Sequence, residues 1–503
     1  MKTRTKLSAS AIVAALLSTS AAQADVTAAQ VWQDWKDYYG EIGQTVTAAS
    51  ESMEGDTLVV NDVKIVSEAA EGTTEGTIAE VRLQEMGDGT VEITMSNEIP
   101  VIVHAKPAEG TPSDIAVKLT HQDLKIVASG TPDVTDYAFT APEIGMAMDE
   151  AKVDGSSAPV KMQITAKGNS GKYHSEKAVG RILTSEMASD SVTFAVTGAD
   201  PESGGTFNMT GAMNGVAGTG NMATPTGVDM KDLNAALQAG LTIAGDFAYQ
   251  DGTYKIEGTG ADGDFVAEST GGTGKLSVSM SKDGLSYGGD AADSTVTVTS
   301  PSIPFPIEAA VAQTAFNLVM PVSKSETAQP AKFLMKLVDF KVSDGLWNMI
   351  DPGSQLPRDP ATLVIDLSGA IRPLVDLFDP KQAEALVSAD PAAAPPSPFE
   401  VSEAKINQLQ LKAVGAELTG TGAMTFDNSA MPPKPLGAID LNLTGANALM
   451  DKLVAMGLVP EDQIMGVRMM LGMFSVPAGE DAVTSKIEFK EDGGIYANGQ
   501  RIQ

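Results

Sequence analysis

The stretch GTIAEVRLQEMGDGTVEITMSN, residues 76–97, decides the fold class of this chain. Apolar and polar side chains alternate on both sides of a Gly-Asp-Gly turn at 87–89, and this period of two is typical of extended strands. Two alternating segments joined by a short, glycine-containing turn indicate an antiparallel hairpin. We therefore predict that residues 76–97 form a β-hairpin.

The same alternation recurs from about residue 58 to residue 300. Further examples are IAVKLTHQDLKIVASG (115–130), DSVTFAVTGADPESGGTFNMTGAM (190–213) and LTIAGDFAYQDGTYKIEGTG (241–260). Short strands separated by Gly, Asp and Asn turns indicate a mainly β protein with a large antiparallel β-sheet architecture. No fixed repeat length accompanies the pattern, so we predict neither a solenoid nor a propeller.

The strands fall into two β-rich halves. The first covers residues 53–295. The second, residues 296–503, begins near the proline-rich SPSIPFPI and continues with strands expected at 332–342, 362–367 and 406–411. Alternation alone does not decide whether the halves form one continuous sheet or two domains, and curved and sandwich-like arrangements both fit it.

Residues 25–52 contain a predicted N-terminal helix. Trp32, Trp35, Tyr39 and Ile42 recur at helical spacing and form one aromatic and apolar stripe. This stripe fits either a helix packed on the body of the protein or an anchor at a membrane interface, where Trp and Tyr are common. The polar face of the helix carries mainly acidic residues, which favours packing on the body of the protein.

Helices are also predicted in the middle and near the end of the chain. One mid-chain helix lies in VDMKDLNAALQAGL (228–241), with Gly240 near its C-terminal end. A C-terminal helix pair lies in GANALMDKLVAMGLVPEDQIMGVRMMLGMF (445–474). Gly457 ends the first helix of this pair, and Pro460 opens the second.

Residues 1–24 are typical of a secretory signal peptide. A positive region with Lys2 precedes the apolar run 11–17, and an A-x-A motif at 22–24 predicts cleavage after Ala24. The apolar run is too short to anchor the chain across a bilayer, so we predict no transmembrane anchor after cleavage. We therefore expect an exported protein with a periplasmic location.

Composition excludes several classes of site and partner. The chain has no cysteine, which excludes thiol catalysis, cysteine metal sites and a lipidated N-terminal cysteine. Its formal net charge is −31, from 34 basic and 65 acidic side chains. We expect no nucleic-acid partner, because an acidic surface repels phosphate backbones. Solubility is the favoured explanation of this charge, ahead of an acidic docking surface.

Residues that could carry a reaction are few. The spacing of the three histidines, His104, His121 and His174, matches no metal-ligand pattern. No Walker A loop, G-x-S-x-G elbow or H-E-x-x-H motif occurs. We therefore predict no catalytic, cofactor-binding or metal-binding residues and no enzymatic activity.

The segment SDGLWNMIDPGSQLPRDPATLVIDLSG, residues 343–369, holds four aspartates, three prolines, one arginine and one of the three tryptophans within 27 residues. Its four aspartates invite comparison with a cation site, but three of them precede glycine or proline in turn-forming pairs. We interpret the segment as a structural corner in which Arg358 pairs with a carboxylate and Trp347 packs beneath. The three turn-forming aspartates are Asp344, Asp351 and Asp359.

Several segments together resemble one known family. They are LWNMIDPGSQLPRDPATLVIDLSG (346–369), QVWQDWKDYYGEIGQTVTA (30–48), SPSIPFPI (300–307) with PVSKSETAQP (321–330), and the closing helix pair followed by GGIYANGQ (493–500). Over most of its length the chain resembles an exported proteobacterial family, domain of unknown function 2125, also called putative bacterial lipoprotein. The resemblance implies no activity and no site residues, and the lack of cysteine departs from the lipoprotein label. The closing helices and strand are also similar to AsmA-related envelope proteins.

Two functions fit these observations best. The first is a structural or assembly factor of the cell envelope that acts on an envelope protein partner, since exposed strand edges can dock other chains. The alternative is a periplasmic carrier of an apolar ligand such as a lipid in a β-sheet groove, for which 24 methionines against 14 phenylalanines are suited. A hydrolase built from carboxylates ranks below both. An apolar concavity in the fold would distinguish the first two.

Overall fold

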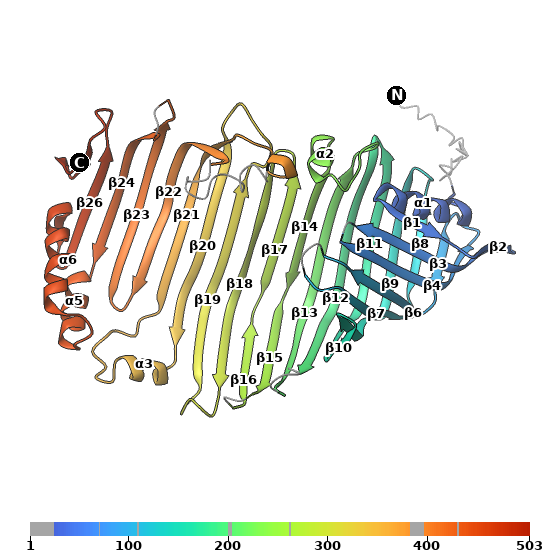
Figure 1. Ribbon diagram of the computed structural model, residues 1–503, viewed down its shortest axis with the longest axis horizontal. Helices are drawn as coiled ribbons and strands as arrows, with labels where there is room; N and C mark the ends of the chain where they lie inside the picture. The colour runs from blue at the N-terminus through green and yellow to red at the C-terminus, as the bar shows by residue number, and fades with distance from the viewer. Residues whose placement is uncertain are drawn as a thin grey trace, which may run out of the picture.

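The computed structural model describes residues 25–69, 71–107, 110–199, 204–260, 263–382, 397–429 and 432–503. The predicted signal peptide, residues 1–24, lies outside the described residues. The described chain forms one antiparallel sheet that extends from one end of the molecule to the other, with helices at its ends and rims (Figure 1). The prediction of a mainly β protein with a large antiparallel sheet is confirmed.

The N-terminal part of the sheet contains the hairpin predicted from residues 76–97. Its strands are β4 (Gly72–Glu85) and β5 (Val91–Met95), which pair in antiparallel register. Figure 1 shows β3 and β4 running across the direction of the long central strands. The other strands of this part are β1 (Gln44–Thr47), β2 (Ser50–Glu54), β3 (Thr57–Ala69), β6 (Glu98–Ala105), β7 (Ser113–Gln122), β8 (Lys125–Gly130), β9 (Val134–Val153) and β10 (Ser156–Ala158).

The remainder of the sheet is a succession of long strands. β18 (Gly284–Thr299) contains the junction between residues 295 and 296 and pairs with β19 (Ile307–Met320) on both sides of it, so the two β-rich halves form one continuous sheet. The other strands are β11 (Val160–Ala178), β12 (Gly180–Ala199), β13 (Thr206–Thr224), β14 (Thr242–Tyr249), β15 (Asp251–Thr259), β16 (Phe265–Gly271), β17 (Gly274–Ser281), β20 (Gln329–Val342), β21 (Ala361–Pro373), β22 (Phe399–Ala413), β23 (Ala416–Asp427), β24 (Lys434–Thr444), β25 (Val476–Gly479), β26 (Ala482–Phe489), β27 (Ile495–Ala497) and β28 (Gln500–Arg501).

The predicted N-terminal helix, mid-chain helix and C-terminal helix pair are all present. They are α1 (Ala28–Glu41), α2 (Leu233–Gln238), α5 (Ala446–Ala455) and α6 (Glu461–Phe474). Thr27 and Gln30 begin α1 with a capping box, in which each side chain bonds the backbone N–H of the other residue. No helix in the described part of the chain is long and apolar enough to cross a membrane.

One short helix, α3 (Asp344–Ile350), corrects the interpretation of residues 343–369. Asp344 was expected in a turn, but it is the first residue of α3. Ser343 precedes it in the extended conformation of a helix N-cap. An acidic side chain in the first turn is favoured by the helix dipole, which explains why Asp344 opens a helix here.

The best-buried apolar side chains gather at the N-terminal end of the sheet. Val60, Val81, Leu83 and Ile93 are fully buried there, and Trp32 of α1 exposes only 3 % of its surface. A smaller cluster lies beneath α2 and is built around Ala236, Leu237 and Leu241.

The molecule exposes an unusually large surface for its mass. Its accessible surface is 29389 Å². A compact monomer of 52.0 kDa would expose roughly 17,000 Å². A single extended sheet contributes to the difference, because much of it has no second layer packed against it.

Candidate functional site

One face of the sheet is apolar along its whole length. Directly opposed residues of antiparallel strands place their side chains on the same face, so the register can be followed from strand to strand. One row of opposed residues, which we call the apolar row, contains no charged side chain. Its members are Tyr137, Tyr173, Ser185, Gly220, Gly245, Val278, Tyr287, Leu318, Phe333, Leu367, Ile406, Gly422, Ile439, Ile487 and Ala497.

A parallel row on the same face combines large apolar residues with glycines. A Cβ atom on Gly171 would lie 2.3 Å from the ring of Phe139, so this ring lies over the glycine and fills the space of the missing side chain. The result is a floor built from large side chains lying across glycines. Its residues are Phe139, Gly171, Met187, Gly218, Phe247, Leu276, Gly289, Phe316, Met335, Ile365, Leu409, Gly420, Leu441 and Ser485.

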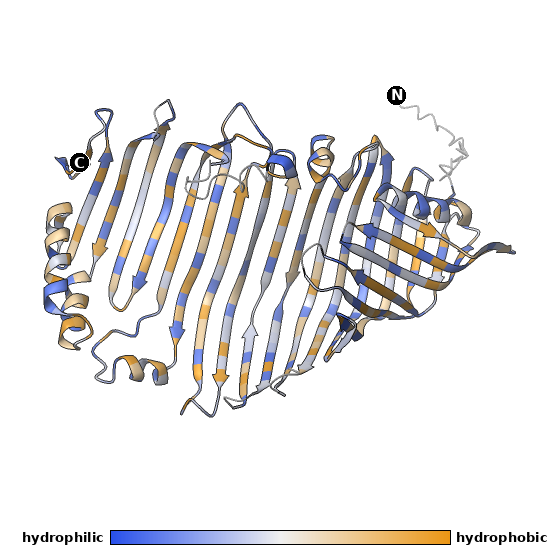
Figure 2. Cartoon of the chain, viewed as in Figure 1, coloured by the Kyte–Doolittle hydropathy of each residue, from blue (hydrophilic) through white to orange (hydrophobic). Residues whose placement is uncertain are grey.

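The opposite face of the same strands is polar. The row of opposed residues between the two apolar rows points the other way, because side chains alternate along a strand. Figure 2 shows the resulting alternation of hydrophilic and hydrophobic positions along the strands. The residues of this polar row are Ala138, Lys172, Glu186, Thr219, Asp246, Ser277, Gly288, Asn317, Leu334 and Asp366.

The middle of the apolar face is open. Tyr287, Leu318 and Phe333 of the apolar row expose 44 %, 37 % and 43 % of their surfaces, and Met187 exposes 56 %. A sheet ordinarily buries such a face against a second layer. In the described part of the chain, no such layer lies over these residues, whereas contiguous exposed apolar surface of this kind is typical of a binding site.

The N-terminal end of the same face is covered and hollow. A cavity of about 600 Å³ lies between α1 and the strands β1, β3, β4, β6, β9 and β11. Its wall is mostly apolar and includes Val63, Ile78 and Ile99 from the strands and Trp35 from α1. Tyr137 and Tyr173, the first members of the apolar row, also line it. The cavity is therefore continuous with the open apolar face and forms its helix-covered end.

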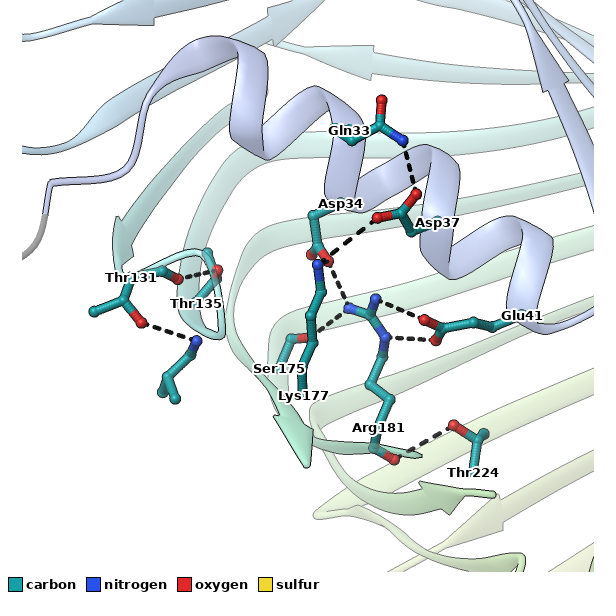
Figure 3. Close-up of polar contacts among 11 residues, drawn as sticks. Gln33, Asp34, Asp37, Glu41, Thr131, Thr135, Ser175, Lys177, Arg181 and Thr224 are labelled. Atoms are coloured by element: carbon teal, nitrogen blue, oxygen red, sulfur yellow. Dashed lines mark hydrogen bonds and ion pairs between the residues drawn. The ribbon is translucent and has the colours of Figure 1, made fainter. Parts of the chain in front are cut away.

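Arg181 fixes α1 over this cavity (Figure 3). The side chain of Arg181 is only 2 % exposed. Its guanidinium donates hydrogen bonds to Asp34 at 2.9 Å, to Glu41 at 2.8 and 3.2 Å, and to Ser175 at 2.8 Å. Lys177 adds an ion pair with Asp34 at 2.8 Å. Because Arg181 and Lys177 flank the turn between β11 and β12, these bonds join the helix to the sheet.

The charges of this group are nearly balanced. Burial alone would lower the pKa of Arg181, but the hydrogen bonds to Glu41 and the charge of Asp34 outweigh it, so the pKa of Arg181 is raised. The guanidinium therefore stays charged and already bonds two carboxylates. An arginine in this state has little capacity to bind an additional anion.

Of the residues that line the cavity, Trp32 and Tyr137 each have a buried polar atom without a hydrogen-bond partner in the described part of the chain, and Tyr137 is the one with a hydroxyl. It exposes 7 % of its surface, and its hydroxyl has no hydrogen-bond partner among the described residues. Burial raises the pKa of Tyr137 above its ordinary value, and the negative charge of Asp34 adds to the effect. The hydroxyl is therefore protonated at neutral pH and can donate a hydrogen bond to a ligand.

The structure does not bring the three histidines together. His104 bonds Asp114 at 2.7 Å, His174 bonds Asp136 at 2.7 Å, and His121 contacts the backbone carbonyl of Ser96. No group of three or more His, Cys, Asp or Glu side chains that could hold a metal ion occurs within the described ranges.

Residues 343–369 contain the expected Arg–Asp pair. Arg358 bonds Asp344 and also donates to Asn348 at 2.7 Å. Asp351 is buried and accepts a hydrogen bond from the backbone N–H of Leu356 at 2.7 Å. Hydrogen bonds from the backbone hold the pKa of Asp351 below its usual value. These contacts are local and serve the turn that follows α3.

Sequence reasoning did not single out Arg181 or Tyr137. A signal for Arg181 was present, because in GRILTSEM (180–187) it shares the alternation of Leu183, which is an apolar position. A charged residue at such a position indicates a buried ion pair. Tyr137 had no comparable signal, since a tyrosine in a strand is common.

Comparisons with known proteins give a family and nothing further. A comparison with curated proteins found no match, and a comparison with solved structures also found none. Residues 228–502 match the family model described as uncharacterized protein conserved in bacteria (DUF2125). This match covers more than half of the chain, and the chain therefore belongs to the DUF2125 family.

Proposed function

We propose that this protein binds and carries a chain-like apolar ligand, of the class of lipid acyl chains, along the apolar face of its sheet. The observation that carries the proposal is the uninterrupted row of uncharged residues from Tyr137 to Ala497, open in its middle and covered at its N-terminal end. The function is one of binding, and we assign no reaction to the chain.

The exposed area is sufficient to hold such a ligand. Leu318 exposes 37 % of its surface, and covering that area would contribute about 1.5 kcal/mol at ~25 cal/mol per Å². Tyr287 and Phe333 lie on either side of it in the apolar row and expose similar fractions. A ligand that covers several such positions gains several kcal/mol before the cost of its own ordering.

The dimensions favour an extended ligand. Neighbouring strands lie about 4.8 Å apart, so the apolar row from β9 to β26 is roughly 60 Å long. Half the hydrocarbon core of a bilayer is about 15 Å thick, so the row is several times longer than one lipid leaflet. We propose that the ligand lies across the strands, and that the predicted export of the chain would place this carrier in the periplasm.

A structural or assembly factor acting through protein contacts is the second candidate. α6 supports it, because Met465, Met469, Met470 and Met473 expose between 51 % and 62 % of their surfaces. Flexible methionine side chains suit adaptable protein interfaces. A photo-crosslinker placed at Met469 should then give one defined adduct with an envelope protein, and a crosslinker at exposed Glu480 should not.

The carrier proposal is tested by native mass spectrometry of the protein purified from its own source, followed by extraction and lipid analysis. We expect a stoichiometric lipid in the unaltered protein. Leu318→Glu should reduce its occupancy at least tenfold, because a charged side chain under an acyl chain loses hydration. Leu334→Glu is the matched control, since Leu334 pairs with Asn317 on the polar face of the same strands. Equal occupancy in both variants would refute the proposal.

A further inference from the structure

The cavity beneath α1 has chemical features that the open face lacks. It has a volume of about 600 Å³, within the range of about 300–1,000 Å³ that is usual for small-molecule sites. It is enclosed on the α1 side by Trp32 and Trp35, whereas Tyr287 in the same apolar row is 44 % exposed. A ligand end inside this cavity would therefore be shielded from water on the α1 side.

Two residues that line the cavity, Trp32 and Tyr137, have a buried polar atom without a hydrogen-bond partner in the described part of the chain, and both atoms can donate. The hydroxyl of Tyr137 is buried and lacks a hydrogen-bond partner in the described part of the chain. An unsatisfied buried hydroxyl is unfavourable, so a ligand that supplies an acceptor oxygen recovers part of that free energy. A pure hydrocarbon has no acceptor oxygen and would not recover it.

The charges at the cavity do not suit an anionic ligand. Asp34, Asp37 and Glu41 of α1 face Arg181 and Lys177, which leaves the acidic residues in excess (Figure 3). Arg181 already donates to both Asp34 and Glu41. A carboxylate or phosphate group placed here would lose its hydration without gaining an unpaired cation.

We propose that this cavity binds the end of a neutral apolar chain that carries an acceptor oxygen, such as a long-chain ester or alcohol, with Tyr137 donating a hydrogen bond to that oxygen. This inference rests on the proposed carrier function and adds the chemical class of the ligand and its orientation. The oxygen-bearing end lies under α1, and the hydrocarbon chain extends from there over the open face.

The test uses three probes that share one brominated chain: the methyl ester of 9,10-dibromostearate, the 9,10-dibromostearate anion and 9,10-dibromooctadecane. Bromine quenches nearby tryptophan, and Trp32 and Trp35 both line the cavity. The third tryptophan, Trp347, lies in α3 and is replaced by Trp347→Phe, so that the remaining fluorescence reports on the cavity. Affinities of the same probes for the unaltered protein are measured by native mass spectrometry.

We expect the ester to quench at concentrations at least tenfold below those needed for the anion. Tyr137→Phe should weaken binding of the ester about fivefold, the value of one hydrogen bond of ~1 kcal/mol, and should leave the hydrocarbon unchanged. Tyr496→Phe is the control, because Tyr496 precedes Ala497 of the apolar row in β27 and therefore lies on the opposite face; its loss of a hydroxyl should change neither affinity.

The outcomes separate this inference from the proposed function. If the ester binds, and Leu318→Glu weakens it, but Tyr137→Phe has no effect or the anion binds as tightly, the carrier function stands and the cavity assignment is wrong. If none of the three probes binds the unaltered protein in native mass spectra, both are wrong. Quenching that needs about fivefold more ester in Tyr137→Phe, and the same amount of ester in Tyr496→Phe, supports both.

Discussion

Arg181 should hold α1 on the sheet, and Arg181→Met tests this directly. The substitution keeps an unbranched apolar stem but removes the guanidinium and its four hydrogen bonds to Asp34, Glu41 and Ser175. Asp34, which is 7 % exposed, keeps only its ion pair with Lys177. Removing one partner of a buried ion pair costs about 3–5 kcal/mol, and the remaining Lys177 pair places this case near the lower end, at about 3 kcal/mol.

A cost of about 3 kcal/mol raises the population of the detached helix by roughly two orders of magnitude. Amide hydrogen exchange followed by mass spectrometry measures this population for residues 28–41, with β12 and β13 as the internal reference. We expect exchange in α1 to become about 100-fold faster in Arg181→Met while the reference strands keep their protection. Lys177→Met is the control: Lys177 is 32 % exposed, and such pairs contribute about 0–1 kcal/mol.

Two results would contradict this reasoning. Unchanged exchange in α1 would mean that burial of Trp32 and Val31 alone fixes the helix. Faster exchange spread evenly over α1, β12 and β13 would mean that Arg181 stabilises the sheet as a whole. Either result would remove the role that we assign to the ion pairs.

Further substitutions probe the floor, the helices and a carboxylate. Gly171→Ala should destabilise the protein by about 1–3 kcal/mol in urea unfolding, because its Cβ would lie 2.3 Å from the ring of Phe139; no measurable loss would show that the floor can adjust. Gly472→Ala in α6 meets no atom within 4 Å and should stabilise by up to ~1 kcal/mol, and a lower midpoint would contradict this. Asp481 accepts hydrogen bonds from the backbone N–H groups of Asn447 and Ala448 at 2.9 Å, so Asp481→Ala should cost about 1 kcal/mol. Burial alone would raise the pKa of Asp481, but the hydrogen bonds from the backbone outweigh burial, and the pKa in the folded protein is lowered. The contribution of Asp481 to stability is therefore fully present above the pKa of the unfolded chain and is lost as the pH falls through the pKa of the folded protein. A difference between wild type and Asp481→Ala that persists in acid would refute this.

The strands and helices could be predicted from local patterns, but the continuous apolar face could not. The reason is visible in β9, where Phe139 and Met146 stand at odd and even positions on either side of Pro142. Strict alternation would assign them to opposite faces. Leu119 lies opposite Met146, and Leu119 lines the same cavity as Phe139. The odd-numbered Phe139 before Pro142 and the even-numbered Met146 after it therefore face the same side of the sheet. A proline inside a strand marks such an irregularity, but its effect on the face depends on the neighbouring strands.

The cavity was also beyond prediction from the sequence, for a different reason. The stripe of Trp32 and Trp35 indicated a helix packed on the body of the protein, and Trp32 is indeed buried. The partner of that stripe is distant in the chain: Arg181 lies far beyond α1 and meets it only because the sheet brings β12 beneath the helix. Contacts of this kind depend on strand order, which local periodicity does not contain.

The construction of the apolar floor bears on which ligand it suits. Interfaces between proteins depend on a few anchor side chains that enter well-packed pockets. Here Phe139 lies over Gly171, and Met187 approaches Gly218 in the same way, so the protein fills those spaces with its own side chains. The resulting surface is apolar over a long distance and offers few fixed positions for an anchor residue. A hydrocarbon chain needs no such position, because its transfer free energy depends on covered area and is non-directional. The floor therefore favours a chain-like ligand over a protein partner, and the exposed methionines of α6 are the better place to look for the latter.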